Sequence, residues 1–102
     1  MGAAAAIEAV RALAGAVSPV LQVSEIRTIA ADHLWMSPQY WRDSVGIHFT
    51  WRPHQAAVQR ALALLETALA PFGARPHWGK LFVAEAATVA PLYPRHADFA
   101  RL

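Results

Sequence analysis

The feature that most constrains this chain is the segment SVGIHFTW (residues 44–51), in which large apolar residues alternate strictly with small or polar ones. Successive side chains of a strand point to opposite faces, so this pattern predicts a strand with one core-facing side. Its other side would carry Gly46, His48 and Thr50. A second segment, VLQVSEIRTIA (residues 20–30), is rich in β-branched residues and also predicts a strand. A two-stranded sheet is marginally stable by itself, so other elements must support it.

The other segments favour helices that could cover such a sheet. Residues 3–16 are rich in alanine, and residues 54–73 repeat apolar residues at helical spacing before a proline and a glycine. Pro53 is expected in the first turn of the second helix. Residues 81–84 (LFVA) predict a short strand, and residues 84–102 two short helical pieces broken at prolines. This order predicts an α+β fold, with an antiparallel sheet packed on one side by helices.

Length and composition exclude several classes of protein. A chain of 102 residues forms one domain, which we assign to residues 1–102. It contains no cysteine, which excludes disulfides and thiolate metal sites and favours a cytoplasmic location. The net charge of +2 is spread without a basic stripe, so no nucleic-acid partner is expected. No apolar run approaches the roughly 20 residues that would span a membrane.

The apolar fraction of the chain is 56%, above the roughly 45–50% typical of globular domains. Such an excess leaves apolar surface for a partner. A homo-oligomer is therefore one expectation for this chain.

Five polar side chains form the candidate site. Glu25 and Arg27 lie two residues apart and therefore share a strand face, as do His48 and Thr50 on the neighbouring strand. If these faces align, Lys80, the only lysine, could close the patch from the loop ARPHWGKLF (residues 74–82). Such groups suit a polyhydroxylated ligand. An ordinary charge pair on a solvated sheet face explains the same spacing, and both interpretations stay open at this point.

Other candidate sites are weaker. Three histidines could be considered as metal ligands: His48, His54 and His77. Their spacing matches no known ligand motif, so no metal is expected. His77 is expected to pack within its loop beside Trp78. The aromatic residues between the two strands are interpreted as packing anchors because no basic groove accompanies them: they are Trp35, Tyr40 and Trp41.

Longer stretches of the sequence resemble a known family. SEIRTIAADHLWMSPQYWRDSVGIHFTW (residues 24–51), followed by PFGARPHWGKLF and LYPRHADF, is similar to the C-terminal part of the alditol (xylitol, sorbitol) oxidases. These enzymes stand with the aldonolactone oxidases, including D-arabinono-1,4-lactone oxidase, in the vanillyl-alcohol oxidase superfamily of flavoproteins. The resemblance extends from about residue 20 to residue 102. It implies the substrate-recognition portion of an FAD-dependent oxidoreductase, with a sheet incomplete relative to the full oxidase.

The resemblance also implies roles for the candidate residues. Glu25, Arg27, Thr50 and Lys80 would bind a polyol or an aldonolactone. Arg27 and Lys80 would stabilise negative charge on the reacting oxygen, and His48 would assist proton removal. FAD would accept the hydride, and dioxygen would reoxidise it to give hydrogen peroxide.

No FAD-binding domain is recognised in this sequence, and no cofactor-binding residue is assigned. FAD is expected on a separate domain or subunit, and the chain alone, a fragment of the oxidase, is expected to be inactive. The competing hypothesis is a non-catalytic binding or assembly module that dimerises or docks on a flavoprotein partner.

Overall fold

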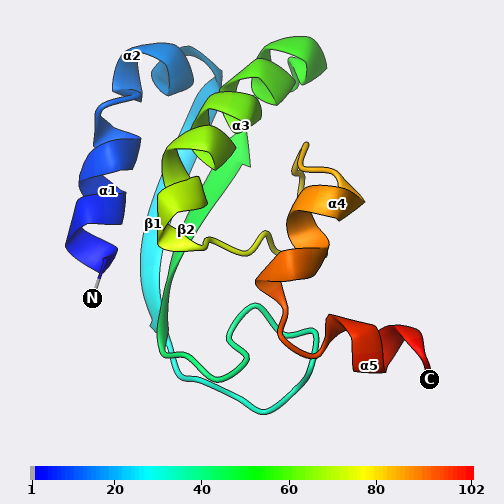
Figure 1. Ribbon diagram of the computed structural model, residues 1–102. Coiled ribbons are helices and arrows are strands. Elements are labelled where there is room, and N and C mark those ends of the chain that lie inside the picture. Colours follow the sequence, from blue (N-terminus) through cyan, green and yellow to red (C-terminus); the bar gives the residue numbers. More distant parts are fainter. Residues whose placement is uncertain (1) are drawn as a thin grey trace.

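The computed structural model describes residues 2–102 and confirms the α+β class (Figure 1). Two strands and a set of helices and 3₁₀ turns follow one another along the chain: α1 (Ala3–Arg11), α2 (Ala14–Val17), η1 (Ser18–Val20), β1 (Leu21–Ile29), β2 (Ser44–Trp51), α3 (Gln55–Leu69), η2 (Ala70–Phe72), α4 (Ala86–Val89), η3 (Ala90–Leu92) and α5 (His96–Ala100). Figure 1 shows α1 and α3 beside the strands, whereas α4 and α5 form a separate C-terminal group.

The two strands pair antiparallel in the register that the candidate site requires. Glu25 lies opposite His48, and Arg27 lies opposite Gly46. The register shifts between Leu21 and Val23, so that Leu21 pairs with Trp51 on the helix-packed face. Strict alternation from residue 20 to residue 30 predicts Leu21 on the face of Glu25. That expectation is wrong because an extra residue in a strand moves everything before it to the other face.

The core lies between the sheet and the helices. Helix α3 buries Val58, Leu62 and Leu65 on one side, and the aromatic rings of Phe49 and Trp51 pack against this cluster. Full burial of an aliphatic side chain such as Leu65 contributes roughly 1.5–3 kcal/mol to the free energy of unfolding. The predicted apolar face of the second strand therefore faces the helices.

Three local predictions differ from the structure. The N-terminal helix ends at Arg11 instead of continuing to residue 16, and a separate short helix, α2, follows it. The long helix begins at Gln55, with His54 as its N-cap, so Pro53 lies outside it. Residues 81–84, which were expected to form a short strand, form none. The backbone N–H of Val83 instead donates a hydrogen bond to the Glu66 carboxylate (2.7 Å). In a strand, this N–H could have bonded to the backbone carbonyl of a neighbouring strand.

The connection between the strands is held by local hydrogen bonds. Asp32 accepts from the backbone N–H of Leu34 and the hydroxyl of Ser37. Tyr40 is buried as expected of a packing anchor. Trp41, in contrast, has a φ of 56° and an exposed fraction of 67%, so the expectation that it anchors the loop is wrong.

No single helix among residues 2–102 has the length and apolar character to cross a bilayer. The segments 3–11 and 14–20 together pass that test by length and composition alone, with a bend of 57° between them.

Candidate functional site

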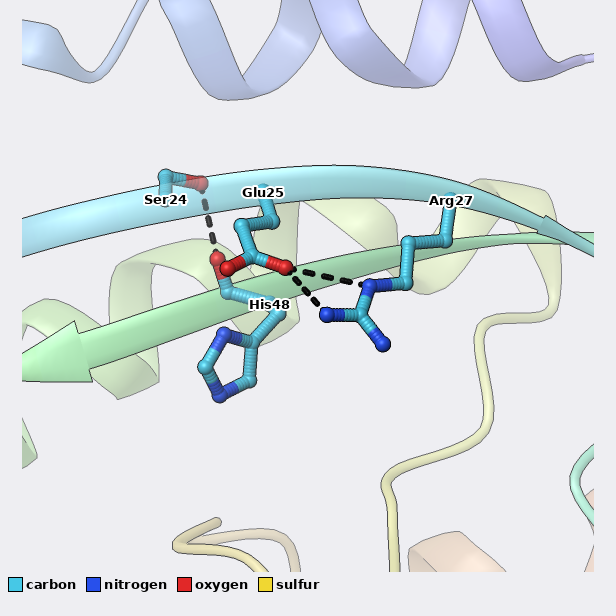
Figure 2. Close-up of polar contacts among 4 residues, drawn as sticks. All are labelled: Ser24, Glu25, Arg27 and His48. Carbon is cyan, nitrogen blue, oxygen red and sulfur yellow. Dashed lines mark hydrogen bonds and ion pairs between the residues drawn. The ribbon is translucent and has the colours of Figure 1, made fainter.

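An ion pair on the sheet face opposite the helices forms the centre of the candidate site (Figure 2). Arg27 donates from Nε and Nη2 to Oε2 of Glu25, at 3.0 and 2.5 Å. His48 lies directly across from Glu25 on β2. Figure 2 shows all three side chains pointing away from helix α1. Period-two alternation and the antiparallel register thus bring these groups from two strands onto one face.

The Glu25 carboxylate is ionised and oriented by its neighbours. The hydrogen bonds and positive charge of Arg27 lower its pKa, and His48 adds a smaller effect in the same direction. Both bonds from Arg27 end on Oε2, while Oε1 accepts no hydrogen bond within residues 2–102. Oε1 is therefore available to accept hydrogen bonds from a ligand.

The remaining strand residues of the predicted site share this face. Thr50 is opposite Val23 and two residues from His48. The strands are further tied together on the other face, because the Ser24 hydroxyl donates to the backbone carbonyl of His48 (2.8 Å). Gly46 leaves space for Ile29, whose Cδ1 would lie 3.0 Å from a Cβ at position 46. The structure therefore places the four strand residues of the site, Glu25, Arg27, His48 and Thr50, on one surface.

Lys80 lies in a separate turn that is anchored by its neighbours. The Lys80 N–H donates to the carbonyl of His77 (3.1 Å), and Nδ1 of His77 accepts from the N–H of Gly79 (2.9 Å). The indole N–H of Trp78 donates to the Met36 carbonyl (2.6 Å). Within residues 2–102, the Lys80 ammonium makes no hydrogen bond or ion pair. His77 is thus hydrogen-bonded within its loop but is exposed rather than packed, and the structure does not join Lys80 to the sheet face.

Arg75 and Tyr93 fix this loop and were missed at the sequence level. The Arg75 guanidinium lies 5.0 Å from the centre of the Tyr93 ring and donates to the carbonyls of Leu92, Pro38 and Tyr40. Tyr93 stacks on Trp78 with ring centres 5.3 Å apart. No periodicity links residues this far apart in sequence. The prolines and aromatic residues near Arg75 and Tyr93 are the sequence signal that the two segments pack together.

Two cavities of the described chain lie away from the polar face. An apolar cavity of about 230 Å³ separates α1 and α2 from the sheet, and an open cleft lined mainly by Trp35, Trp78 and their neighbours lies near the C-terminal helices. None of the four polar strand residues lines either one. The candidate site is thus a surface that a second body would have to enclose. Residues 2–102 also contain no group of three metal-ligating side chains.

A two-stranded sheet with helices on one face and charged, hydroxyl and imidazole groups on the other defines an α+β protein with a candidate face for a hydroxylated ligand. The model of the D-arabinono-1,4-lactone oxidase family matches residues 3–102, and the chain belongs to this family of flavoprotein oxidoreductases. Alditol oxidase from Streptomyces sp. (strain IKD472 / FERM P-14339) is 46% identical over 97 residues, or 95% of this chain. The match covers 23% of that relative, so the chain spans about a quarter of its length. The resemblance inferred from the sequence is confirmed.

Membership of this family implies FAD in the full enzyme, but residues 2–102 do not fit it. The cavity of about 230 Å³ beside α1 and α2 is lined mostly by apolar side chains, and the polar face is an open strand surface. An extended dinucleotide needs an enclosed site with polar groups for its phosphates. None of the residues described in this chain is therefore given a role in holding FAD.

Proposed function

We propose that this chain is the substrate-binding part of an FAD-dependent alditol oxidase-like oxidoreductase that acts on a polyol or an aldonolactone. The observation that carries the proposal is the position of the Glu25–Arg27 pair beside His48, within a chain that belongs to the D-arabinono-1,4-lactone oxidase family. Polyols present several hydroxyls that both donate and accept hydrogen bonds. A face that combines an acceptor with cationic donors can hold such a ligand in one orientation.

Each strand residue has a role that its position supports. Glu25 accepts from ligand hydroxyls through Oε1 while Oε2 holds Arg27 in place. Arg27 is 72% exposed at its side chain, and its remaining N–H groups can stabilise charge that develops on a hydroxyl oxygen. Thr50 bonds a further hydroxyl. His48 removes a proton or fixes the ligand, according to how the ligand lies.

Lys80 completes the site in this proposal. The anchored turn presents a flexible side chain that makes no other hydrogen bond or ion pair in the described part of the chain. Its ammonium would add a second positive charge at the reacting oxygen. FAD, held by another domain or subunit, would supply the acceptor for hydride.

The inactivity of the isolated chain is the first test of this proposal. We expect the purified chain, mixed with FAD and xylitol, to release no hydrogen peroxide, because residues 2–102 do not fit FAD. A peroxide assay coupled to a peroxidase measures this directly. Adding the remaining part of an alditol oxidase is expected to restore peroxide release. Turnover by the chain alone would contradict the proposal.

Substitution of Lys80 tests the site itself. In the completed enzyme, Lys80→Met is expected to lower kcat/KM by at least about tenfold, as befits loss of a group that stabilises developing charge. Arg60→Met is the matched control, because it removes an exposed charge from helix α3. Equal turnover of both variants would remove Lys80 from the role given to it.

A second candidate function is a non-catalytic binding or assembly module. The observation that favours it is the exposure of large apolar side chains on β1, where Val23 and Ile26 are about half exposed. Oxidase activity that is restored by complementation and lost in Lys80→Met would exclude this candidate.

A further inference from the structure

The segment that carries Lys80 is tied to the connection between the two strands through one arginine. Arg75 donates from Nη1 to the backbone carbonyls of Pro38 and Tyr40, at 3.3 and 3.1 Å. Its Nε donates to the carbonyl of Leu92 (2.9 Å), so one planar group joins three segments. None of the ion pairs within the described chain includes Arg75. Its guanidinium is therefore held by neutral acceptors, whose directions specify its position.

Two further side chains tie the same segment to the same connection. The indole Nε1 of Trp78 donates to the carbonyl of Met36 (2.6 Å). Arg42 donates from Nη2 to the carbonyl of Gly73 (2.8 Å), at the start of the segment. The segment is thus fixed at three points along its length, and Lys80 follows two residues after the last of them.

The connection is itself fixed next to the ends of β1 and β2. The N–H of Asp32 donates to the carbonyl of Gln39 (3.1 Å), and the N–H of Trp41 donates to the carbonyl of Asp32 (3.0 Å). The Asp43 carboxylate accepts from the N–H of Ala31 (2.9 Å). The position of the lysine turn relative to the strands is therefore set through the connection, and not by a contact with the sheet face.

The charge of Arg75 makes this corner costly to build. Burial lowers the pKa of its guanidinium, and the positive charge of the nearby Arg42 acts in the same direction. Partly burying a cation without a carboxylate costs free energy, and an apolar side chain of similar volume would fill the corner without that cost. The arrangement therefore favours a role in fixing geometry over a role in stability alone.

We propose that Arg75 and Trp78 are positioning residues, which hold the Lys80 turn at a fixed distance from the sheet face so that the ammonium reaches a ligand bound by Glu25 and Arg27. The inference rests on the proposed function, in which Lys80 stabilises charge on the reacting oxygen. A misplacement of about 1 Å in such a group can lower turnover by about 100-fold.

The distance from the turn to the sheet tests this role without any measurement of activity. The chain has no cysteine, so Thr28→Cys and Lys80→Cys place two spin labels at exposed positions, one on β1 and one on the turn. Double electron–electron resonance of the labelled full chain is expected to give one narrow distance distribution. Arg75→Met is expected to broaden it, whereas Arg60→Met, which removes an exposed charge from α3, is expected to leave it unchanged. A broad distribution in the chain that retains Arg75, or an equally narrow one in Arg75→Met, would overturn the positioning role.

A double-mutant cycle in the completed enzyme tests whether Arg75 acts through Lys80. Arg75→Met is expected to lower kcat/KM by at least about tenfold when Lys80 is present, and by less than about twofold when Lys80→Met is already in place. A merely structural role would lower kcat/KM equally in both backgrounds. That result would overturn the inference and leave the role of Lys80 intact. Wild-type turnover of Lys80→Met would instead contradict the proposed function, and the inference with it.

Trp78→Phe gives a milder test in case Arg75→Met does not fold. It keeps an aromatic ring for stacking and deletes the hydrogen bond to the Met36 carbonyl. We expect a smaller loss of kcat/KM than in Arg75→Met, again confined to enzyme that retains Lys80. Trp41→Phe is the matched control, because the Trp41 indole N–H makes no hydrogen bond within the described chain. Equal turnover of the two phenylalanine variants would overturn the role given to Trp78.

Discussion

The hydroxyl of Tyr93 is buried without a hydrogen-bond partner, and removing it is expected to stabilise the protein. Tyr93 is 2% exposed, and its OH is unsatisfied in the described structure. Burial also raises the pKa of this phenol, as expected for a group cut off from water. An unsatisfied buried polar group costs about 1–3 kcal/mol. Tyr93→Phe keeps the ring stacked on Trp78 and deletes only this hydroxyl.

We therefore expect Tyr93→Phe to raise the free energy of unfolding by about 1 kcal/mol, and Tm by about 4 °C for a domain of this size. Urea denaturation followed by circular dichroism measures the first quantity, and calorimetry the second. Tyr40→Phe is the matched control. Tyr40 is also buried, but its hydroxyl interacts with Arg95 and helps to raise the pKa of that guanidinium. Its loss should leave stability unchanged or lower it. A Tyr93→Phe variant that is no more stable than wild type would refute the reasoning.

Three further perturbations follow from other parts of the structure. Arg27→Ala should raise the pKa of Glu25 toward its ordinary value, and an NMR titration of the carboxyl group that shows no change would contradict the pairing. The stabilisation of the fold by this pair is present above the unfolded-state pKa of Glu25. It is lost as the pH falls through the lowered folded-state pKa. Leu65→Ala should cost about 2–5 kcal/mol in urea denaturation, whereas the neighbouring Leu64→Ala should cost far less because Leu64 is 46% exposed; similar losses would argue against the assigned core. Gly73→Ala should cost about 1 kcal/mol, because Gly73 has a φ of 64°, and an unaffected Tm would show that the turn relaxes.

The candidate site was predictable to the extent that it lies on regular strands. Alternation along the sequences of β1 and β2 is sufficient to place Glu25 with Arg27, and His48 with Thr50. The antiparallel pairing of the strands confirms that the two sets share a face. The position of Lys80 was not predictable in this way, because its loop is anchored by Trp78 and Arg75 to segments far along the chain. The roles of these residues in substrate binding stay predictions.

By itself, the sequence determined the α+β class, the two strands, the faces of their side chains and the family. These follow from local periodicity and from residue motifs, which need no knowledge of distant contacts. Only the tertiary structure decided the register irregularity that moves Leu21 to the helix side, and the replacement of an expected strand by a hydrogen bond from Val83 to Glu66. Each of these depends on which distant groups compete for the same hydrogen bonds, and alternation within one segment carries no information about that competition.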